Sequence, residues 1–182
     1  MRVKTVLTNA ALATVVAVST LAAQAPTSGW RAEFLNSLGG AERKYVALAE
    51  ATPWATHAWR PGQGVRSVCE VFLHISGANY MFAEPLGAKT PASVDLQNIE
   101  KCPASRDQVV ATLKASFAHL RNAVVSASDA SADAPVEIFG MKMTRRGLLL
   151  FTAEHMGEHL GQSIAYARVN KIVPPWSAGG GG

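Results

Sequence analysis

A basic stripe of the kind that nucleic-acid-binding proteins carry is absent from this chain of 182 residues. Its lysines and arginines are scattered, and the densest groups are the pairs Arg43-Lys44 and Arg145-Arg146. Internal repeats are absent as well, and no linker divides the chain into two domains. We therefore expect one domain with no nucleic-acid partner, and the pI of 9.3 indicates little about its ligands.

A strongly apolar run that could span a membrane is also missing, because the apolar stretch 6–22 is rich in Ala and Thr. This stretch follows Arg2 and Lys4 and ends at Ala23-Gln24-Ala25. A charged start, an apolar middle and a small-x-small end are typical of a secretory signal peptide. Residues 1–25 are therefore predicted to be a signal peptide, so the mature protein is expected to be secreted or periplasmic, with no membrane segment after cleavage.

Four amphipathic segments with helical spacing account for most of the remaining chain, and no strand pattern competes with them. Capping boxes are predicted at Ser67 with Glu70 and at Ser105 with Gln108, where each helix begins. The expected helices cover about residues 29–51, 67–84, 105–126 and 144–169. Residues 126–146 are expected to form a small hairpin or an irregular flap, and residues 177–182 a disordered tail.

The lengths of the connections predict the topology. A short segment joins the first two helices, whereas about 20 residues join the second to the third. The fold class is therefore predicted to be all-α, an up-down-down-up four-helix bundle over residues 26–176 with a long crossover. Such a crossover returns Cys102 to the end of the bundle where Cys69 begins the second helix. A Cys69–Cys102 disulfide is expected in an oxidising compartment, with two unpaired thiols as the alternative.

Three histidines are predicted to face one another inside the bundle. His155 and His159 lie four residues apart in the last helix, and this spacing places both rings on one face. His74 occupies a core-facing position of the second helix and is the candidate third metal ligand. The alternative is that these rings are hydrogen-bonded core histidines without a metal. His57, in a loop, and His119, out of step with the apolar face of its helix, are expected to face solvent.

Several short motifs surround these histidines. They are Trp59-Arg60-Pro61, Ser67 seven residues before His74, the H-x-x-x-H-x-G-Q pattern over 155–162, and Pro174-Pro175. Together they resemble the DinB-like (DinB/YfiT-like) superfamily of metalloenzymes over essentially the whole mature chain. The resemblance implies an up-down-down-up bundle, often a homodimer. It also implies one divalent ion, commonly zinc or nickel, held by a histidine of the second helix and two of the last. Those ligand positions match His74, His155 and His159.

The segment His155-x-x-Glu158-His159 also fits the inverted zinc-protease pattern, in which the glutamate is the general base. Proteases of this type take an acidic third ligand downstream of the motif. No Asp or Glu follows Glu158 in this chain, so the protease interpretation lacks a ligand.

Three histidine ligands would leave an open position on the ion, which distinguishes catalytic sites from closed structural ones. The DinB-like resemblance implies activation of a small thiol for transfer. A metal-bound hydroxide could instead attack an electrophile in a hydrolysis, with Glu158 or Glu154 as proton carrier. An oxidising location disfavours the thiol chemistry, because small thiol cofactors belong to reducing compartments. The non-enzymatic alternative is a binding or structural module in which the ion only joins two helices. The sequence leaves the small-molecule substrate unknown.

Overall fold

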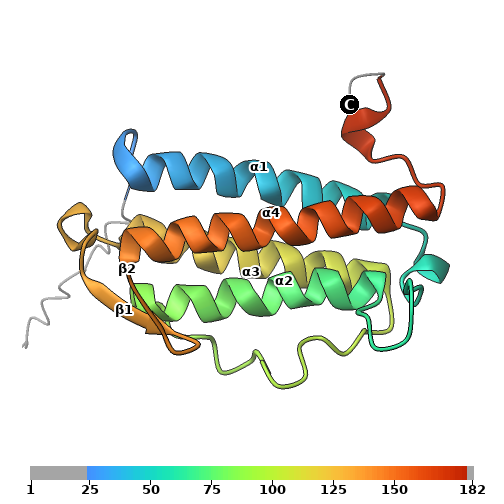
Figure 1. Cartoon of the computed structure of the whole chain (residues 1–182), viewed down its shortest axis with the longest axis horizontal. Coiled ribbons are helices and arrows are strands. Elements are labelled where there is room, and N and C mark those ends of the chain that lie inside the picture. Colours follow the sequence, from blue (N-terminus) through green and yellow to red (C-terminus); the bar gives the residue numbers. More distant parts are fainter. Residues whose placement is uncertain (1–23, 180–182) are drawn as a thin grey trace, which may run out of the picture.

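All four predicted helices are present in the computed structural model, which describes residues 24–179 (Figure 1). They are α1 (Gly29–Ala51), α2 (Val68–Ala83), α3 (Arg106–Ser126) and α4 (Arg145–Val169). Figure 1 shows α1 and α4 running in one direction and α2 and α3 in the other. The helices therefore form the predicted up-down-down-up bundle, and the all-α fold class is confirmed.

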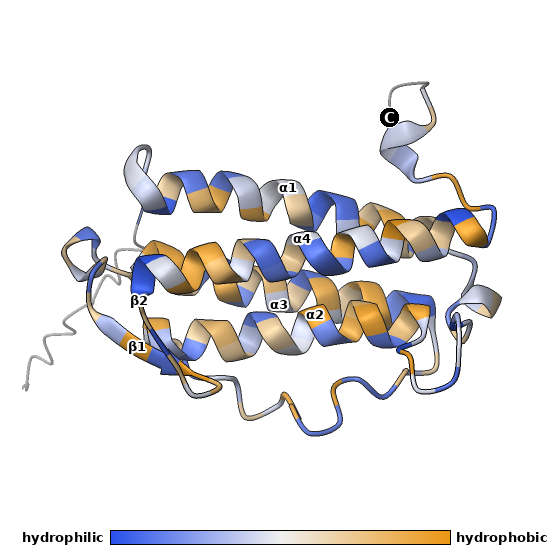
Figure 2. Cartoon of the chain, viewed as in Figure 1, coloured by the Kyte–Doolittle hydropathy of each residue, from blue (hydrophilic) through white to orange (hydrophobic). Residues whose placement is uncertain are grey.

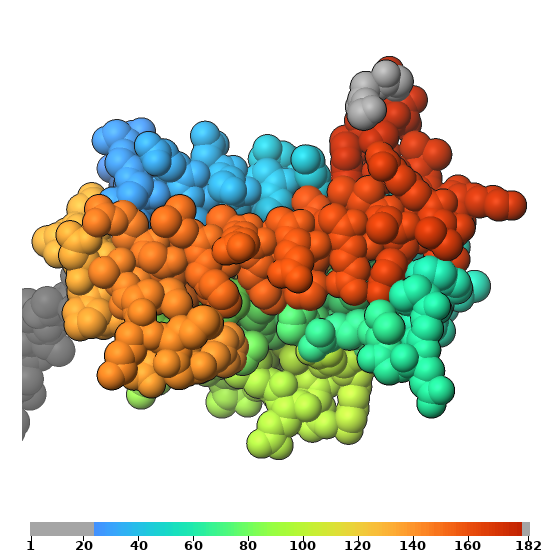
Figure 3. All heavy atoms as spheres, in the orientation of Figure 1, coloured from blue at the N-terminus to red at the C-terminus, as the bar shows by residue number. Residues whose placement is uncertain are grey.

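Hydrophobic side chains fill the space between the helices. Both α1 and α2 pack mainly on α3 and α4, so α1 and α2 occupy opposite corners of the bundle. Hydrophobic residues recur between hydrophilic ones along every helix (Figure 2), and α4 crosses the face shown in Figure 3. At the centre, the Tyr45 ring lies 6.5 Å from that of Phe72 and 5.9 Å from that of Phe117. The Tyr45 hydroxyl donates a hydrogen bond to the Met156 carbonyl at 2.7 Å, so this buried polar group has a partner.

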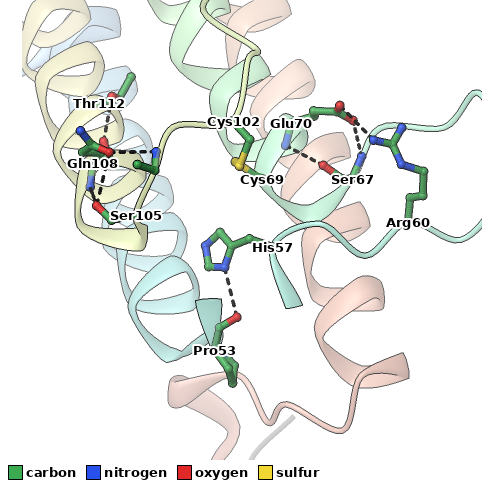
Figure 4. Close-up of a disulfide and its surroundings, with 11 residues drawn as sticks. Pro53, His57, Arg60, Ser67, Cys69, Glu70, Cys102, Ser105, Gln108 and Thr112 are labelled. Carbon is green, nitrogen blue, oxygen red and sulfur yellow. Dashed lines mark hydrogen bonds and ion pairs between the residues drawn. A yellow bond between two sulfur atoms is a disulfide. The ribbon is translucent and has the colours of Figure 1, made fainter. Parts of the chain in front are cut away.

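Of the two predicted capping boxes, the one at α2 is complete and the one at α3 is partial. At α2, the Ser67 hydroxyl accepts from the Glu70 N–H, and the Glu70 carboxylate accepts from the Ser67 N–H, as a capping box requires (Figure 4). At α3, Ser105 accepts from the Gln108 N–H, but the Gln108 side chain accepts from the N–H of the preceding Ala104. The capping box predicted at α3 is therefore present in one of its two hydrogen bonds.

The crossover from α2 to α3 returns along the outside of the bundle (Figure 1). After a short 3₁₀ turn at Glu84–Leu86, its residues form turns rather than helix. Near its end, Cys102 forms a disulfide with Cys69 of the first turn of α2, with the two Cα atoms 5.9 Å apart (Figure 4). The predicted pairing is confirmed, and it fastens the crossover to the end of the bundle where α2 begins.

The segment between α3 and α4 contains a hairpin. Of the two structures expected for residues 126–146, a small hairpin or an irregular flap, the hairpin is therefore the one present. Strands β1 (Pro135–Ile138) and β2 (Met141–Thr144) pair antiparallel. Both residues of the connecting loop, Phe139 and Gly140, have positive φ angles of 52° and 75°, as a type I′ hairpin turn requires. Strand β2 leads directly into α4, because the Thr144 hydroxyl caps the first turn of that helix.

His57 and His119 were expected to face solvent, and this expectation was wrong for His57. The His57 side chain is 1% exposed, because the loop before α2 folds back over the start of that helix. There the free Cys69 N–H donates to the His57 carbonyl at 3.0 Å, and the His57 ring packs 6.2 Å from that of Phe72. His119 is half-buried, with its ring 5.0 Å from that of Tyr80.

Two predictions concern the ends of the chain. Residues 1–23 of the predicted signal peptide and residues 180–182 of the predicted tail lie outside the described residues. At the start of the predicted tail, Pro175–Ser177 form a 3₁₀ turn. Trp176 in this turn packs against the core. Among the described helices, none has the length and apolar character needed to cross a membrane.

Candidate metal centre

Three histidines from two facing helices come together near the middle of the bundle. His74 lies in the middle of α2, and His155 and His159 lie one turn apart in the middle of α4. One ring nitrogen from each lies within 4.8 Å of the other two. The Nε2 atoms of His74 and His155 are 3.2 Å apart, and the His159 ring centroid lies 4.7 Å and 4.6 Å from the other two centroids. The structure therefore brings together all three residues predicted as ligands.

Hydrogen bonds behind the rings set the protonation of two histidines. His74 Nδ1 lies 2.7 Å from Glu100 Oε1, and a carboxylate only accepts, so this Nδ1 carries the proton. His159 Nδ1 lies 2.8 Å from Gln162 Oε1, and the amide nitrogen of Gln162 donates to the Tyr166 hydroxyl. The amide oxygen of Gln162 therefore accepts from His159. With Nδ1 donating in both rings, Nε2 is the nitrogen of each that can offer a lone pair to an ion shared with His155.

This arrangement fits a divalent ion. Two ligand nitrogens bound at about 2.0–2.1 Å to a tetrahedral ion are about 3.3 Å apart, and the His74–His155 Nε2 separation is 3.2 Å. Lone pairs that face each other at this distance repel unless a cation or a proton lies between them. His155 Nδ1 is buried with no hydrogen-bond partner among residues 24–179, and this ring is instead packed against the ring of Phe82 at 5.4 Å. Imidazole nitrogens are ligands that suit zinc and nickel.

The surroundings favour neutral rings. Burial, followed by the nearby His159, His74 and Arg66, lowers the pKa of His155 to about 4. Burial is also the largest cause that lowers the pKa of His74, although the hydrogen bond to Glu100 opposes it. Both rings are therefore uncharged at neutral pH, each with one N–H and one free lone pair, the form in which imidazole binds a metal.

An acidic residue of the crossover lies directly behind His74. Besides its contact with His74, the Glu100 carboxylate accepts two hydrogen bonds from Arg66, at 2.8 Å from Nε and 3.1 Å from Nη2. Burial raises the pKa of Glu100, but the hydrogen bonds from Arg66 and His74 outweigh it and lower the pKa overall. Glu100 is therefore ionised and acts as a pure acceptor. Sequence reasoning missed this residue, because the crossover has no periodicity that relates it to the bundle.

A cavity of about 590 Å³ opens on the surface close to the residues that hold the histidines. Two of the residues that line it, Glu100 and Gln162, are those that hold His74 and His159. The full lining consists of Arg60, Gly64, Val65, Arg66, Glu70, Glu100 and Gln162. It is thus formed by the loop before α2, the first turn of α2, the crossover and α4, and the loop, the crossover and α4 are visible on the face shown in Figure 3. None of the three histidines lines this cavity, which adjoins the cluster through Glu100 and Gln162.

Glu158, predicted as a proton carrier, is exposed on α4, and so is Glu154. Among the described residues, neither carboxylate has a hydrogen-bond or ion-pair partner, so the fold does not commit them to a structural contact. A catalytic role for Glu158 stays a prediction.

Comparison with known proteins agrees with the arrangement of the helices. A family model described as the DinB superfamily matches residues 38–163. The structure is similar to that of a DinB-like protein from Bacillus cereus, with a TM-score of 0.67, 17% identity, and coverage of 78% of this chain and 93% of the other. A DinB-like protein from Bacillus subtilis gives a TM-score of 0.62 at 17% identity, with coverage of 78% and 93%. A candidate DinB family member from Exiguobacterium sibiricum gives 0.61 at 19% identity, with coverage of 79% and 93%.

At these identities the structural likeness shows a shared fold. No curated protein matches the sequence significantly. The family model covers more than half of the chain, from α1 to the ligand helix α4. The chain belongs to the DinB superfamily.

Proposed function

We propose that this protein is an exported metal-dependent enzyme in which His74, His155 and His159 hold one divalent ion, zinc or nickel. The observation that carries the proposal is the convergence of one ring nitrogen from each of three histidines, beside a cavity lined by the residues that hold two of the rings. Three protein ligands leave one position of a four-coordinate ion free, and a free position is typical of catalytic sites.

An ion in this site supplies a Lewis acid that lowers the pKa of a bound water or thiol toward neutrality. The protein residues around it orient the ligand rings and set the charge of the cavity wall. Glu100 and Gln162 fix the rings of two ligands, while Arg60 and Arg66 place positive charge on the cavity wall. The reactions that fit are thiol-dependent transfer and hydrolysis. In a hydrolysis, Glu158 is the proposed proton carrier, since it lies next to a ligand on α4 and its carboxylate is exposed.

The location bears on the choice between these reactions. The predicted signal peptide supports export, and the Cys69–Cys102 disulfide supports an oxidising compartment such as the periplasm. Small thiol cofactors are abundant in reducing compartments, so we favour hydrolysis of a small molecule that fits the cavity. Neither a nucleic acid nor a membrane is a proposed partner.

One observation favours a second candidate function. The three histidines come from α2 and α4, so an ion bound by all of them would join two helices that are distant in sequence. In this alternative the ion only stabilises a binding or structural module. The two functions differ in whether an outside molecule can reach the ion.

Titration of cobalt(II) into the metal-free mature protein tests the proposal. We expect one equivalent to bind with the visible absorption of a four-coordinate ion, and added azide to change that spectrum by binding at the open position. A cobalt spectrum that does not respond to azide would support the structural alternative, and no binding would refute both. His159→Ala should lose the signal, whereas the matched control His119→Ala, on α3 and outside the cluster, should keep it.

A further inference from the structure

The turns of the crossover hold the one acidic side chain that contacts a histidine of the cluster within residues 24–179. We propose that Glu100 is the positioning residue for His74 and that the Cys69–Cys102 disulfide holds Glu100 in place, so that metal affinity depends on the disulfide. This inference rests on the proposed metal site, and it adds to that site a residue and a covalent bond outside the ligand set.

The first step concerns the ring of His74. An imidazole on a helix can present either nitrogen by changing its tautomer or by turning its ring. Glu100 removes that freedom, because its ionised carboxylate lies 2.7 Å from Nδ1 and can only accept a proton donor. The Nε2 lone pair then faces His155 and His159. Ligand histidines held in this way by a carboxylate lose about 10- to 100-fold in metal affinity when the carboxylate is removed.

The second step concerns what holds Glu100. Its segment forms turns, so no helix or strand fixes its position. The ion pair with Arg66 is half-exposed on both sides, with side-chain exposures of 41% and 39%, and such pairs hold weakly in water. The neighbouring Ile99 packs close to Gly77 of α2, where a side chain on Gly77 would lie 3.0 Å from Ile99 Cγ2. The remaining anchor, the disulfide at Cys102, is covalent.

The third step concerns how close the disulfide lies to Glu100 and to His74 along the chain. Cys102 follows Glu100 by two residues, which span at most about 7 Å of chain. Its partner Cys69 precedes His74 by five residues in the same helix, a rise of about 7.5 Å along the axis. The disulfide therefore ties the backbone of Glu100 to the helix that carries His74. Without it, the next backbone anchor after Glu100 is α3, which begins six residues later at Arg106.

The test compares metal affinities at one fixed pH, by competition with a chromophoric chelator for zinc in the full mature chain. Glu100→Ala should bind zinc about 10- to 100-fold more weakly than the wild type. Glu100→Gln keeps an acceptor oxygen and should recover part of that loss. Gln97→Ala, an exposed residue of the same segment, is the matched control and should bind as the wild type does. Wild-type affinity in Glu100→Ala would overturn the proposal.

A spectroscopic readout separates positioning from general stability. In the metal-free protein, ¹⁵N NMR should show His74 as the single tautomer protonated at Nδ1. Glu100→Ala should show a mixture of tautomers, and Glu100→Gln should restore the single one. An unchanged His74 tautomer in Glu100→Ala would contradict the positioning role.

Reduction tests the role of the disulfide. A phosphine reductant, or the double substitution Cys69→Ala with Cys102→Ser, should weaken zinc binding in the wild-type background. It should have little further effect in Glu100→Ala, because both changes act through one contact. An equal loss of zinc affinity in both backgrounds would show that the disulfide does not act through Glu100. No loss in the wild type would show that zinc affinity does not depend on the disulfide. Either result would overturn the proposed coupling. Far-UV circular dichroism confirms that each form is folded; if the double variant is not, reduction of the folded wild type in the cold gives the same comparison.

Failure of this inference is distinguishable from failure of the proposed function. An oxidised wild-type protein that binds no zinc removes the metal site itself. A wild-type protein that binds zinc with an affinity insensitive to Glu100 and to reduction leaves the site intact and removes only the coupling.

Discussion

Removal of the disulfide should lower the free energy of unfolding by about 4 kcal/mol. The two cysteines are 33 residues apart. The cross-link removes about 12 cal/mol/K of entropy from an unfolded chain with a loop of that length, or about 3.7 kcal/mol at 25 °C. The substitutions should be Cys69→Ala and Cys102→Ser, because Cys69 is fully buried and a serine there would leave a buried hydroxyl. A loss of this size is large against the roughly 5–15 kcal/mol that stabilises a typical domain.

Equilibrium unfolding in urea, followed by circular dichroism in the metal-free protein, measures this difference. With a slope of about 2 kcal/mol per molar urea, the midpoint should fall by about 2 M. The wild-type protein reduced by a phosphine is the control and should unfold near the same midpoint as the double variant. A loss below about 1 kcal/mol at unchanged slope would contradict the assignment of the disulfide as the tether of the crossover.

Three further outcomes are expected. Tyr45→Phe removes the buried hydrogen bond to the Met156 carbonyl and should cost about 0.5–1.5 kcal/mol in urea unfolding; no loss would show that the bond is not formed. The pKa of His155 is about 4 in the folded protein and about 6.5 when unfolded, so between these values the unfolded chain binds more protons. The metal-free protein should therefore lose stability as pH falls through this window, with a smaller slope in His155→Phe; equal slopes would argue against the lowered pKa. Gly77→Val adds a branched side chain where a Cβ already lies 3.0 Å from Ile99, so it should displace the crossover and weaken zinc binding; an unchanged affinity would contradict the tight packing of Ile99 on α2.

The helices and the three histidines could be predicted because each depends on local spacing. A period of three to four residues decides which face of a helix is buried, and two histidines four residues apart must share a face. His74 could be assigned because it lies among apolar residues of the same face. The crossover length then decided the topology, and the topology placed Cys102 near Cys69, as the structure confirms.

The residues that were not predicted lie in or next to loops, where apolar residues do not recur at a regular spacing. Glu100 reaches His74 only because the crossover is fastened back onto α2, which no local pattern encodes. His57 was expected in solvent because it lies in a loop, yet the free N–H of Cys69 at the start of α2 binds its carbonyl and draws the ring into the core. Arg66 stands next to a recognised capping serine, but its partner is 34 residues away in the sequence. Contacts of this kind follow from tertiary packing and not from propensity.

The central claim is that His74, His155 and His159 together bind one divalent ion. Elemental analysis of the mature protein, supplied with zinc and then dialysed, tests it most directly when it is run beside His159→Ala and the control His119→Ala. About one equivalent of metal should remain in the wild type and in His119→Ala, and far less in His159→Ala. Equal metal content in the wild type and in His159→Ala would contradict the claim.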